Sequence, residues 1–234
     1  MDLIAGDVEI RIAADPFEAA ELVAETLAVA AQRGGHIAVS GGSTPRPAYV
    51  RAAEIEPDWG AVALWFADER CVPQDDARSN YRLVRETLLD GLAFPPIVHR
   101  VHGELPPEEA AVEYDSIAEG LQLDVALLGI GPDGHTASLF PNAPALDARE
   151  RAAVSAEPAL DPWVPRVTLT IPILSSAQLV LFLVSGEDKA AAVERAFGGV
   201  PSRDAPASLV RSERGQTVAV LDRAAASRLE AAAS

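Results

Sequence analysis

This chain of 234 residues contains one cysteine, Cys71, one methionine and one lysine, Lys189. A single cysteine excludes an intramolecular disulfide and suits a reducing compartment. The most apolar run, residues 179–184, is far too short to span a bilayer. The first ten residues carry neither a basic segment nor a long apolar stretch, so we expect no signal peptide. We therefore expect a cytoplasmic protein with no membrane partner.

Positive charge is also scarce. The chain has 19 lysine and arginine residues against 35 acidic ones, a formal net charge of -16. Nucleic acid and anionic membranes need a basic face on their partner, so we expect neither. A small anionic substrate is still compatible with this charge, because a binding site can be locally basic. The composition, 49% apolar and 23% charged, is that of a globular protein with a substantial core.

Short apolar segments alternate with segments of helical periodicity along most of the chain. This order is typical of β-α units, which build a parallel sheet covered on both faces. We therefore predict a single α/β domain over residues 1–234, a mostly parallel sheet with helices on both faces. Residues 143–165, in which Pro158, Pro162 and Pro165 break up a loop, are a candidate for a small embedded subdomain. The predicted strands are residues 8–12, 36–40, 62–67, 124–128, 166–170, 179–184 and 217–221, and the predicted helices are residues 16–33, 46–49, 81–89, 108–119, 190–197 and 223–233.

Four segments that follow predicted strands are polar or rich in glycine. They are residues 40–44 (SGGST), 68–70 (DER), 129–135 (GIGPDGH) and 185–189 (SGEDK). An open α/β sheet binds its ligand outside the carboxyl ends of the strands, and parallel strands place those ends at one edge. The sequence therefore predicts a single site to which all four segments contribute.

The segment at 129–135 combines a glycine turn with a histidine. Gly131 and Gly134 allow positive φ and a close approach of the backbone to a ligand. His135, at the lip of such a turn, suits a general base because imidazole titrates near neutral pH. The alternative is a tight strand-to-helix turn in which the histidine is merely exposed.

Residues 40–44 offer flexible amides and hydroxyls just before a predicted helix. Gly41, Gly42, Ser43 and Thr44 could bind a phosphate or another oxyanion through free amides and the helix dipole. The alternative is an ordinary capping turn. The segment is not a nucleotide P-loop, since the glycine-lysine-hydroxyl signature is absent, and the glycines at 129–134 lack the acidic residue of a dinucleotide-binding fold.

Lys189 is the only lysine of a chain that otherwise uses arginine for positive charge. This exception favours a ligand-binding role for Lys189, in which a compact ammonium is needed. Arg70, after Asp68 and Glu69, could present a planar fork to a phosphate. The alternatives are a solvated lysine at a helix start and an Arg70 that pairs with its acidic neighbours. Weaker candidates of the same kind are Arg46, Arg78 and Arg166.

Two other kinds of chemistry have less support. His99, His102 and Cys71 could hold a metal, but no CxxC or HExxH pattern accompanies them. Ser138 lies three residues after His135, but the GxSxG elbow of a serine nucleophile is absent. We expect Ser138 to cap a helix or to face solvent, and we expect neither a metal nor a cofactor.

The motifs SGGSTP (40–45), ADERCVP (67–73), SNY (79–81) and GIGPDGHTASLFP (129–141) together resemble the 6-phosphogluconolactonase family. RVTLT (166–170) and GEDKA (186–190) continue the resemblance in order, so it covers nearly the whole chain. It departs from the family at residues 77–78, where an acidic residue is frequent, and at 175–176, where an asparagine is common. The resemblance implies the fold shared by sugar-phosphate isomerases and glucosamine-6-phosphate deaminase. It also implies hydrolysis of 6-phosphoglucono-δ-lactone, without a metal, in the pentose phosphate pathway.

The resemblance implies roles for individual residues: His135 as the base, Asp133 as its neighbour in the site, and Arg70 and Lys189 as phosphate ligands. Lactone hydrolysis needs an activated water and a place for the oxyanion, which the amides of residues 41–42 or of residues 131–134 could provide. The predicted substrate-binding residues are Gly41, Gly42, Ser43, Thr44, Asp68, Arg70, Gly131, Gly134, Arg166 and Lys189.

Two alternative functions remain. A glucosamine-6-phosphate deaminase resembles this chain around the histidine but continues with asparagine, glutamate and proline, whereas residues 139–141 are leucine, phenylalanine and proline. A non-catalytic sugar-phosphate sensor usually carries a DNA-binding segment, for which we see neither spare length nor a basic face. The sequence carries no signal for an oligomeric state.

Overall fold

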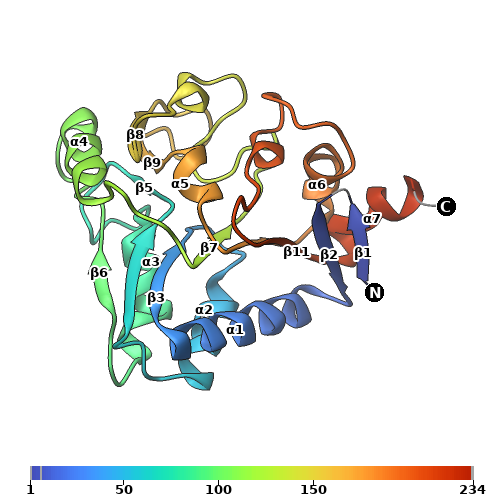
Figure 1. Cartoon of the computed structure of the whole chain (residues 1–234), viewed down its shortest axis with the longest axis horizontal. Coiled ribbons are helices and arrows are strands. Elements are labelled where there is room, and N and C mark those ends of the chain that lie inside the picture. Colours follow the sequence, from blue (N-terminus) through green and yellow to red (C-terminus); the bar gives the residue numbers. More distant parts are fainter. Residues whose placement is uncertain (1, 6, 233–234) are drawn as a thin grey trace.

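The computed structural model describes residues 2–5 and 7–232 of the chain. Its main sheet contains β1 (Asp2–Ala5), β2 (Val8–Ala13), β3 (Gly35–Val39), β4 (Val62–Phe66), β6 (Ile97–His99), β7 (Val125–Leu128), β10 (Leu179–Val184) and β11 (Gln216–Asp222). The strand order is β1-β2-β11-β10-β7-β3-β4-β6, and every neighbouring pair except β1 and β2 is parallel (Figure 1). The predicted mostly parallel sheet is therefore confirmed.

Helices cover both faces of this sheet (Figure 1). The core on one side of β10 receives Leu181 and Leu183, and the core on the other side receives Val180, Phe182 and Val184. Successive side chains of a strand point to opposite faces, so a continuous apolar strand needs an apolar layer on each. The first core contains α1 (Pro16–Arg33), α2 (Arg46–Ile55) and α3 (Asn80–Thr87), and the second contains α4 (Pro107–Ile117), α5 (Ile171–Ser175), α6 (Ala190–Phe197) and α7 (Arg223–Ala232).

The first helix begins and ends where the sequence indicates. The side chain of Asp15 accepts hydrogen bonds from two amides of the first turn, and Pro16 occupies a position at which an amide would have no partner. Gly34 ends the helix with a φ of 74°, a conformation that favours glycine. Local capping interactions are therefore sufficient to set both ends of α1.

Other helix bounds differ from the prediction by a few residues. The helix that was predicted to reach Tyr49 continues to Ile55, and α3 begins at Asn80 rather than Tyr81. The closing helix was predicted to end at residue 233, which lies outside the described residues. The strands β1 and β6 and the short helix α5 were not predicted, because elements of three to five residues are too short for an apolar period to show.

A second, antiparallel sheet contains β5 (Asp68–Arg70), β9 (Arg166–Leu169) and β8 (Ala153–Ala156), in that order. Helix α4 packs against β8 and β9 (Figure 1). The predicted strand at 166–170 therefore belongs to this sheet and not to the main one. Residues 143–165 contribute β8, so this segment shares its sheet with strands outside it.

Ala67 connects the two sheets. Its amide donates to the carbonyl of Val39 in the main sheet, and its carbonyl accepts from the amide of Leu169 in the small sheet, each at 2.8 Å. The chain thus leaves β4 and enters β5 within one residue. As a result, the three residues 68–70 lie at the carboxyl edge of the main sheet while belonging to the small one.

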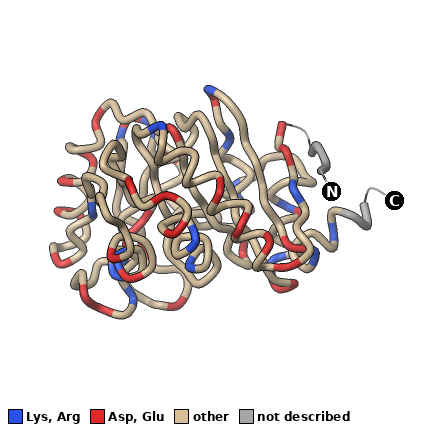
Figure 2. Tube along the Cα trace, turned by 90° about the horizontal axis from the view of Figure 1, so that it is seen from below, with Lys and Arg blue, Asp and Glu red and all other residues tan. Residues whose placement is uncertain are grey.

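Charge is spread over the molecule. Basic positions are scattered among acidic ones along the trace rather than gathered on one side (Figure 2). Among the described helices, none combines the length and the hydropathy that crossing a lipid bilayer requires.

Candidate active site

A cavity of about 600 Å³ lies at the carboxyl edge of the main sheet. The segments that follow β3, β4, β7 and β10 all contribute to its lining, as their polar character predicts. Of the predicted site residues, those that line the cavity are Gly41, Gly42, Ser43, Thr44, Asp68, Arg70, Gly131, His135, Arg166 and Lys189.

Two predicted site residues lie outside this lining. Asp133 is hydrogen-bonded to His135 and so reaches the cavity only through the imidazole. Gly134 has a φ of +95° and packs closely on Ala205, whose Cα would be 3.0 Å from a Cβ at this position. Gly134 therefore shapes the turn from behind, whereas we had expected it to contact the substrate.

Buried polar atoms without a partner are concentrated at this cavity. Arg70 Nε, Arg166 Nε and Ser185 Oγ belong to residues that line it, and only one other such side-chain atom, Asn80 Oδ1, occurs in the described part of the chain. Leaving a buried polar group unpaired costs about 1–3 kcal/mol. Their concentration around one cavity indicates a site made for a polar ligand.

His135 and Asp133 form a close pair. His135 Nδ1 lies 2.5 Å from Asp133 Oδ1, and the same oxygen accepts the backbone amide of His135 at 3.1 Å. Burial opposes the ionisation of Asp133, but the hydrogen bonds and charge of His135 outweigh it, so the pKa of this carboxyl is below its ordinary value. An ionised Asp133 holds the proton at Nδ1, which leaves the Nε2 lone pair of the neutral ring available for proton transfer.

The imidazole lies directly over Gly131. A Cβ at Gly131 would be 2.0 Å from both Cε1 and Nδ1 of His135, so any larger residue would displace the ring. The ring also contacts Phe140, at 4.9 Å between centroids. The turn and the aromatic ring together fix where the histidine points.

The glycine amides of the two loops differ in their availability. The amide of Gly131 donates to the carbonyl of His135 and that of Gly134 to the carbonyl of Gly131, both at 2.9 Å. These two amides serve the turn, which corrects the idea that they could hold an oxyanion. The amides of Gly41 and Gly42 have no partner within the described residues, so residues 41–42 are the better place for one.

Arg70 and Arg166 pair across the small sheet. They are register partners in the antiparallel pair of β5 and β9. Arg70 Nη1 donates to the carbonyl of Arg78 at 2.8 Å, and Arg166 Nη2 donates to the carbonyls of Leu160 and Pro162. Arg70 therefore does not pair with its acidic neighbours through its guanidinium. Both Nε atoms remain free to bind an anion in the cavity.

Arg166 is the more buried of the two, with only 4% of its surface exposed. Burial lowers its pKa, the charge of Asp68 opposes that effect, and the charge of Arg70 adds to it. Its guanidinium also lies 5.4 Å from the centroid of the Phe140 ring. A bound anion would offset the proximity of the two guanidinium groups.

Lys189 reaches the cavity from the segment after β10. Its Nζ lies 3.3 Å from Asp188 Oδ2, and the side chain is 21% exposed. The segment is held by Asp222, whose carboxylate accepts the amide of Gly186 as well as the amide of Ala225 at the start of α7. This carboxylate thus connects the lysine loop to β11 and α7.

Asp68 is held from two sides. Its Oδ2 accepts the hydroxyl of Ser138 at 2.6 Å, and its Oδ1 accepts Asn80 Nδ2 at 3.1 Å. Ser138 is fully buried, so the expectation that it caps a helix or faces solvent is wrong. Residues 136–139 form a tight turn, and within it the hydroxyl of Ser138 lies in the interior, where it positions Asp68.

The three residues considered as metal ligands do not converge. His99 stacks on Trp65 with 4.0 Å between ring centroids, and His102 Nδ1 pairs with Glu113 at 2.7 Å. Burial, with a contribution from His36, lowers the pKa of His99. Within the residues described, no group of three or more histidine, cysteine or acidic side chains is arranged to hold a metal.

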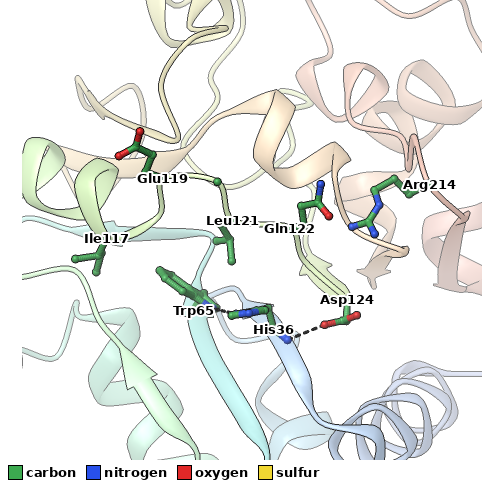
Figure 3. Close-up of a pocket in the computed structure, with 9 residues that line it drawn as sticks. His36, Trp65, Ile117, Glu119, Leu121, Gln122, Asp124 and Arg214 are labelled. Atoms are coloured by element: carbon green, nitrogen blue, oxygen red, sulfur yellow. Dashed lines mark hydrogen bonds between the residues drawn. The ribbon is translucent and has the colours of Figure 1, made fainter.

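A second cavity, of about 470 Å³, lies near the amino ends of β3 and β7 (Figure 3). Trp65 Nε1 donates to His36 Nδ1 at 3.0 Å, and the backbone amide of His36 donates to Asp124 (Figure 3). Arg214 and Glu119 also line this cavity. It contains neither His135 nor any of the four predicted loops, so the chemistry that the sequence indicates belongs to the other end of the strands.

Among the further residues that line the main cavity, four were not named as site residues from the sequence. Leu160 and Asp161 come from the proline-rich segment before β9, and Ser185 and Asp188 belong to the segment that follows β10. The SGEDK motif already contained Ser185 and Asp188. For Leu160 and Asp161 the sequence offers no signal, since the pairing of β9 with β5 brings them to the cavity.

Comparison with known proteins agrees with the resemblance. The family model described as glucosamine-6-phosphate isomerases/6-phosphogluconolactonase matches residues 16–219. The 6-phosphogluconolactonase of Homo sapiens is 41% identical over 177 residues, which cover 71% of this chain and 69% of the relative. That of Streptomyces coelicolor is 34% identical over 232 residues, covering 90% and 88%.

Solved structures give the same result. The crystal structure of 6-phosphogluconolactonase from Thermotoga maritima has a TM-score of 0.81 and 32% identity, and the match covers 92% of this chain and 99% of that one. The predicted fold class is thereby confirmed. The chain belongs to the family of glucosamine-6-phosphate isomerases and 6-phosphogluconolactonases.

Proposed function

We propose that this protein hydrolyses 6-phosphoglucono-δ-lactone to 6-phosphogluconate in the pentose phosphate pathway. The observation that carries the proposal is that one cavity joins a histidine backed by a carboxylate to three cationic side chains. The names of the relatives described above support the same substrate. A cytoplasmic location belongs to the proposal, because a chain with one cysteine suits a reducing compartment.

In this mechanism His135 first activates water. Nε2 takes a proton from a water molecule while the water oxygen attacks the carbonyl carbon of the lactone. The Asp133 carboxylate stabilises the imidazolium that forms, because it accepts a hydrogen bond from the protonated Nδ1. A positioned general base of this kind contributes roughly 10²–10⁴-fold to the rate.

The tetrahedral intermediate then collapses. The bond between the carbonyl carbon and the ring oxygen breaks, and His135 returns its proton to that oxygen, which becomes a hydroxyl. One water has thus been added across the ester bond, and the product acid loses its proton to solvent. The amides of Gly41 and Gly42 stabilise the oxyanion of the intermediate, and each such donor contributes about 10²–10³-fold.

The phosphate is anchored by Arg70, Arg166 and Lys189. Two guanidinium groups suit planar contacts to phosphate oxygens, and the ammonium adds a compact charge. These contacts lie away from the reacting carbonyl, so their binding energy orients the lactone toward His135. The carboxylate of Asp68, held by Ser138 and Asn80, suits a contact to the sugar hydroxyls.

The environment of His135 favours lactone hydrolysis over deamination. A deaminase of this family carries a glutamate immediately before the proline of this motif, at the position of Phe140, whereas Phe140 here packs against the imidazole. A phenyl ring cannot transfer a proton. The acid–base partner that deamination needs is therefore replaced by an apolar contact.

The test is a direct assay of lactone opening. Purified protein should accelerate proton release from 6-phosphoglucono-δ-lactone above its spontaneous hydrolysis, and a coupled dehydrogenase that consumes 6-phosphogluconate should report the same rate. Ammonia release from glucosamine 6-phosphate should stay at background. Ammonia release without lactonase activity would refute the proposal.

A further inference from the structure

Glu69 lies between two cavity residues but faces away from the cavity. Asp68 and Arg70 both line the cavity, and Glu69 separates them in β5. Because successive side chains of a strand point to opposite faces, Glu69 points toward the start of α3. It is 2% exposed, and the mechanism above gives it no part. A buried carboxylate in this place needs a reason.

The carboxylate of Glu69 docks the first turn of α3. Oε1 accepts the amides of Arg70 and Asn80, both at 2.7 Å. Oε2 accepts the amide of Tyr81 at 2.7 Å and the hydroxyl of Ser79 at 3.1 Å. Helix N-termini have unpaired amides and a positive dipole end, so a carboxylate from another strand satisfies both.

Residues of this docked turn also hold Asp68 and Arg70, the two neighbours of Glu69 in β5. Asn80 Nδ2 donates to the backbone carbonyl of Asp68 at 2.8 Å and to its carboxylate at 3.1 Å. The carbonyl of Arg78 accepts Arg70 Nη1 at 2.8 Å. The contacts form a closed hydrogen-bond network. Glu69 holds the first turn of α3, and this turn holds the side chains of Asp68 and Arg70.

This network also contacts the glycine loop at residues 41–42. A Cβ at Gly41 would be 1.7 Å from Asn80 Oδ1, so the loop and the amide of Asn80 are packed against each other without spare room. Any shift of Asn80 would therefore move Asp68 and Gly41 together. His135 and Asp133 lie on a different segment and have no hydrogen bond to Glu69, Asn80 or Arg78 within the described residues.

We propose that Glu69 is a positioning residue for phosphate recognition: by docking α3 on β5 it fixes Arg70, and with it Asp68, in the orientation that binds the phosphorylated sugar. The proposal rests on the function proposed above for the role of Arg70. It predicts that loss of the carboxylate weakens recognition of the phosphate and leaves the histidine chemistry intact.

The first test compares two lactones. In Glu69→Gln, one acceptor oxygen becomes a donor that faces the amide of Tyr81, so the turn must shift. KM for 6-phosphoglucono-δ-lactone should rise roughly ten-fold or more, as expected for loss of a buried charge-assisted contact. KM for the unphosphorylated glucono-δ-lactone, which lacks the group that Arg70 binds, should rise by a much smaller factor. Glu86→Gln, which removes an exposed carboxylate of the same helix, is the control.

The second test asks whether Glu69 acts through Arg70. If it does, Glu69→Gln in an Arg70→Met background should add little to the KM of the single Arg70→Met variant, because the side chain it positions is already gone. Additive effects in this cycle, or equal effects on both lactones, would overturn the proposal. A general loss of packing would produce that second pattern.

A binding measurement separates this proposal from the proposed function. Calorimetric titration with inorganic phosphate should give a weaker Kd in Glu69→Gln than in the wild type, whether or not the lactone is hydrolysed. If Glu69→Gln does not fold, Ser79→Ala removes one of the four contacts and should raise KM for the phosphorylated lactone alone, by a smaller factor. An unchanged phosphate affinity and KM in the variant that folds would overturn the proposal, and absence of lactonase activity in the wild type would overturn only the function.

Discussion

Arg70 and Arg166 lie directly opposite each other in the antiparallel pair of β5 and β9, and each has an unpartnered Nε at the cavity. Like charges in directly opposed positions destabilise an antiparallel pair. A phosphate between the two guanidinium groups would convert this repulsion into attraction to a shared anion. Binding of an anion between them would therefore be favourable even though the protein as a whole is acidic.

This arrangement predicts stabilisation by inorganic phosphate. Phosphate should raise the Tm of the wild type, and Arg70→Met should remove most of the increase, because a ligand stabilises the fold by RT ln(1 + [L]/Kd). Thermal unfolding over a phosphate titration at constant ionic strength measures this. Arg51→Met, which removes a guanidinium paired with Glu21 outside the cavity, should keep the wild-type increase. Equal losses in both variants would contradict a local phosphate site.

Replacement of the proposed base should reduce turnover. His135→Ala should lower kcat for the phosphorylated lactone by at least about 10²-fold, the range expected for loss of a general base, with a smaller effect on KM. Steady-state proton release, corrected for spontaneous opening, measures both constants. His102→Ala removes an imidazole that pairs with Glu113 and should leave kcat unchanged. A near-normal kcat in His135→Ala would dismiss the role.

Gly131→Ala should reduce turnover without changing any charge. The added methyl would overlap Cε1 and Nδ1 of His135, so the ring must move away from its place. We expect kcat to fall by roughly 10-fold or more, since small displacements of a catalytic group are costly. Gly91→Ala, whose Cβ would meet Ala53 at an ordinary 3.5 Å, is the matched control. Unchanged kcat in Gly131→Ala would show that the ring position tolerates displacement.

Loss of the single lysine should chiefly affect binding. Lys189→Met should raise KM for the phosphorylated lactone by about ten-fold and change kcat by less than about three-fold, because an ammonium that contacts only the phosphate stabilises ground and transition states alike. Lys189→Arg should recover part of the loss, since the charge is kept but the geometry differs. The same KM in Lys189→Met and the wild type would remove Lys189 from the phosphate site.

Stability should depend on pH through Glu69. Burial raises the pKa of this carboxyl from 4.5 to about 7, against hydrogen bonds from the amides of Asn80, Tyr81 and Arg70 that lower it. Between these values the folded protein binds more protons than the unfolded chain, so this group makes the free energy of unfolding fall as pH rises from about 4.5 to about 7. Its contribution is full below that window and lost above it.

Glu69→Gln does not titrate and should lack this dependence. The free energy of unfolding of the variant, relative to that of the wild type, should therefore increase as pH rises through the window. Urea denaturation at a series of pH values measures the difference. Parallel curves for the two proteins would mean that the carboxyl titrates alike in the folded and unfolded states.

Much of the site follows from local sequence. The four loops after β3, β4, β7 and β10 could be assigned to one edge because a strand, a glycine or polar turn and a helix recur in order, and parallel strands share their direction. His135 stood out because its glycine turn is a local pattern. Residues 41–42 and Lys189 were found in the same way, by composition within a few positions.

What could not be predicted depends on contacts between distant segments. Ser138 was expected at the surface, yet it is buried and bonded to Asp68, 70 positions away in the chain. Glu69 was taken only as a neighbour of Arg70, since nothing in DER indicates that its middle residue docks a helix that starts eleven positions later. Short strands such as β5 and β8 carry too few residues for a period to be recognised.

The sequence by itself determined the alternating fold, the edge at which the site lies and the histidine that faces it, because apolar period, capping and glycine turns act within one element. Only the tertiary structure decided which groups meet there. Three features depend on register and burial. They are the opposition of Arg70 and Arg166, the hydrogen bonds that the amides of Gly131 and Gly134 make within their own turn, and the docking of α3 by Glu69. These are set by the packing of whole elements, which no single stretch of the chain encodes.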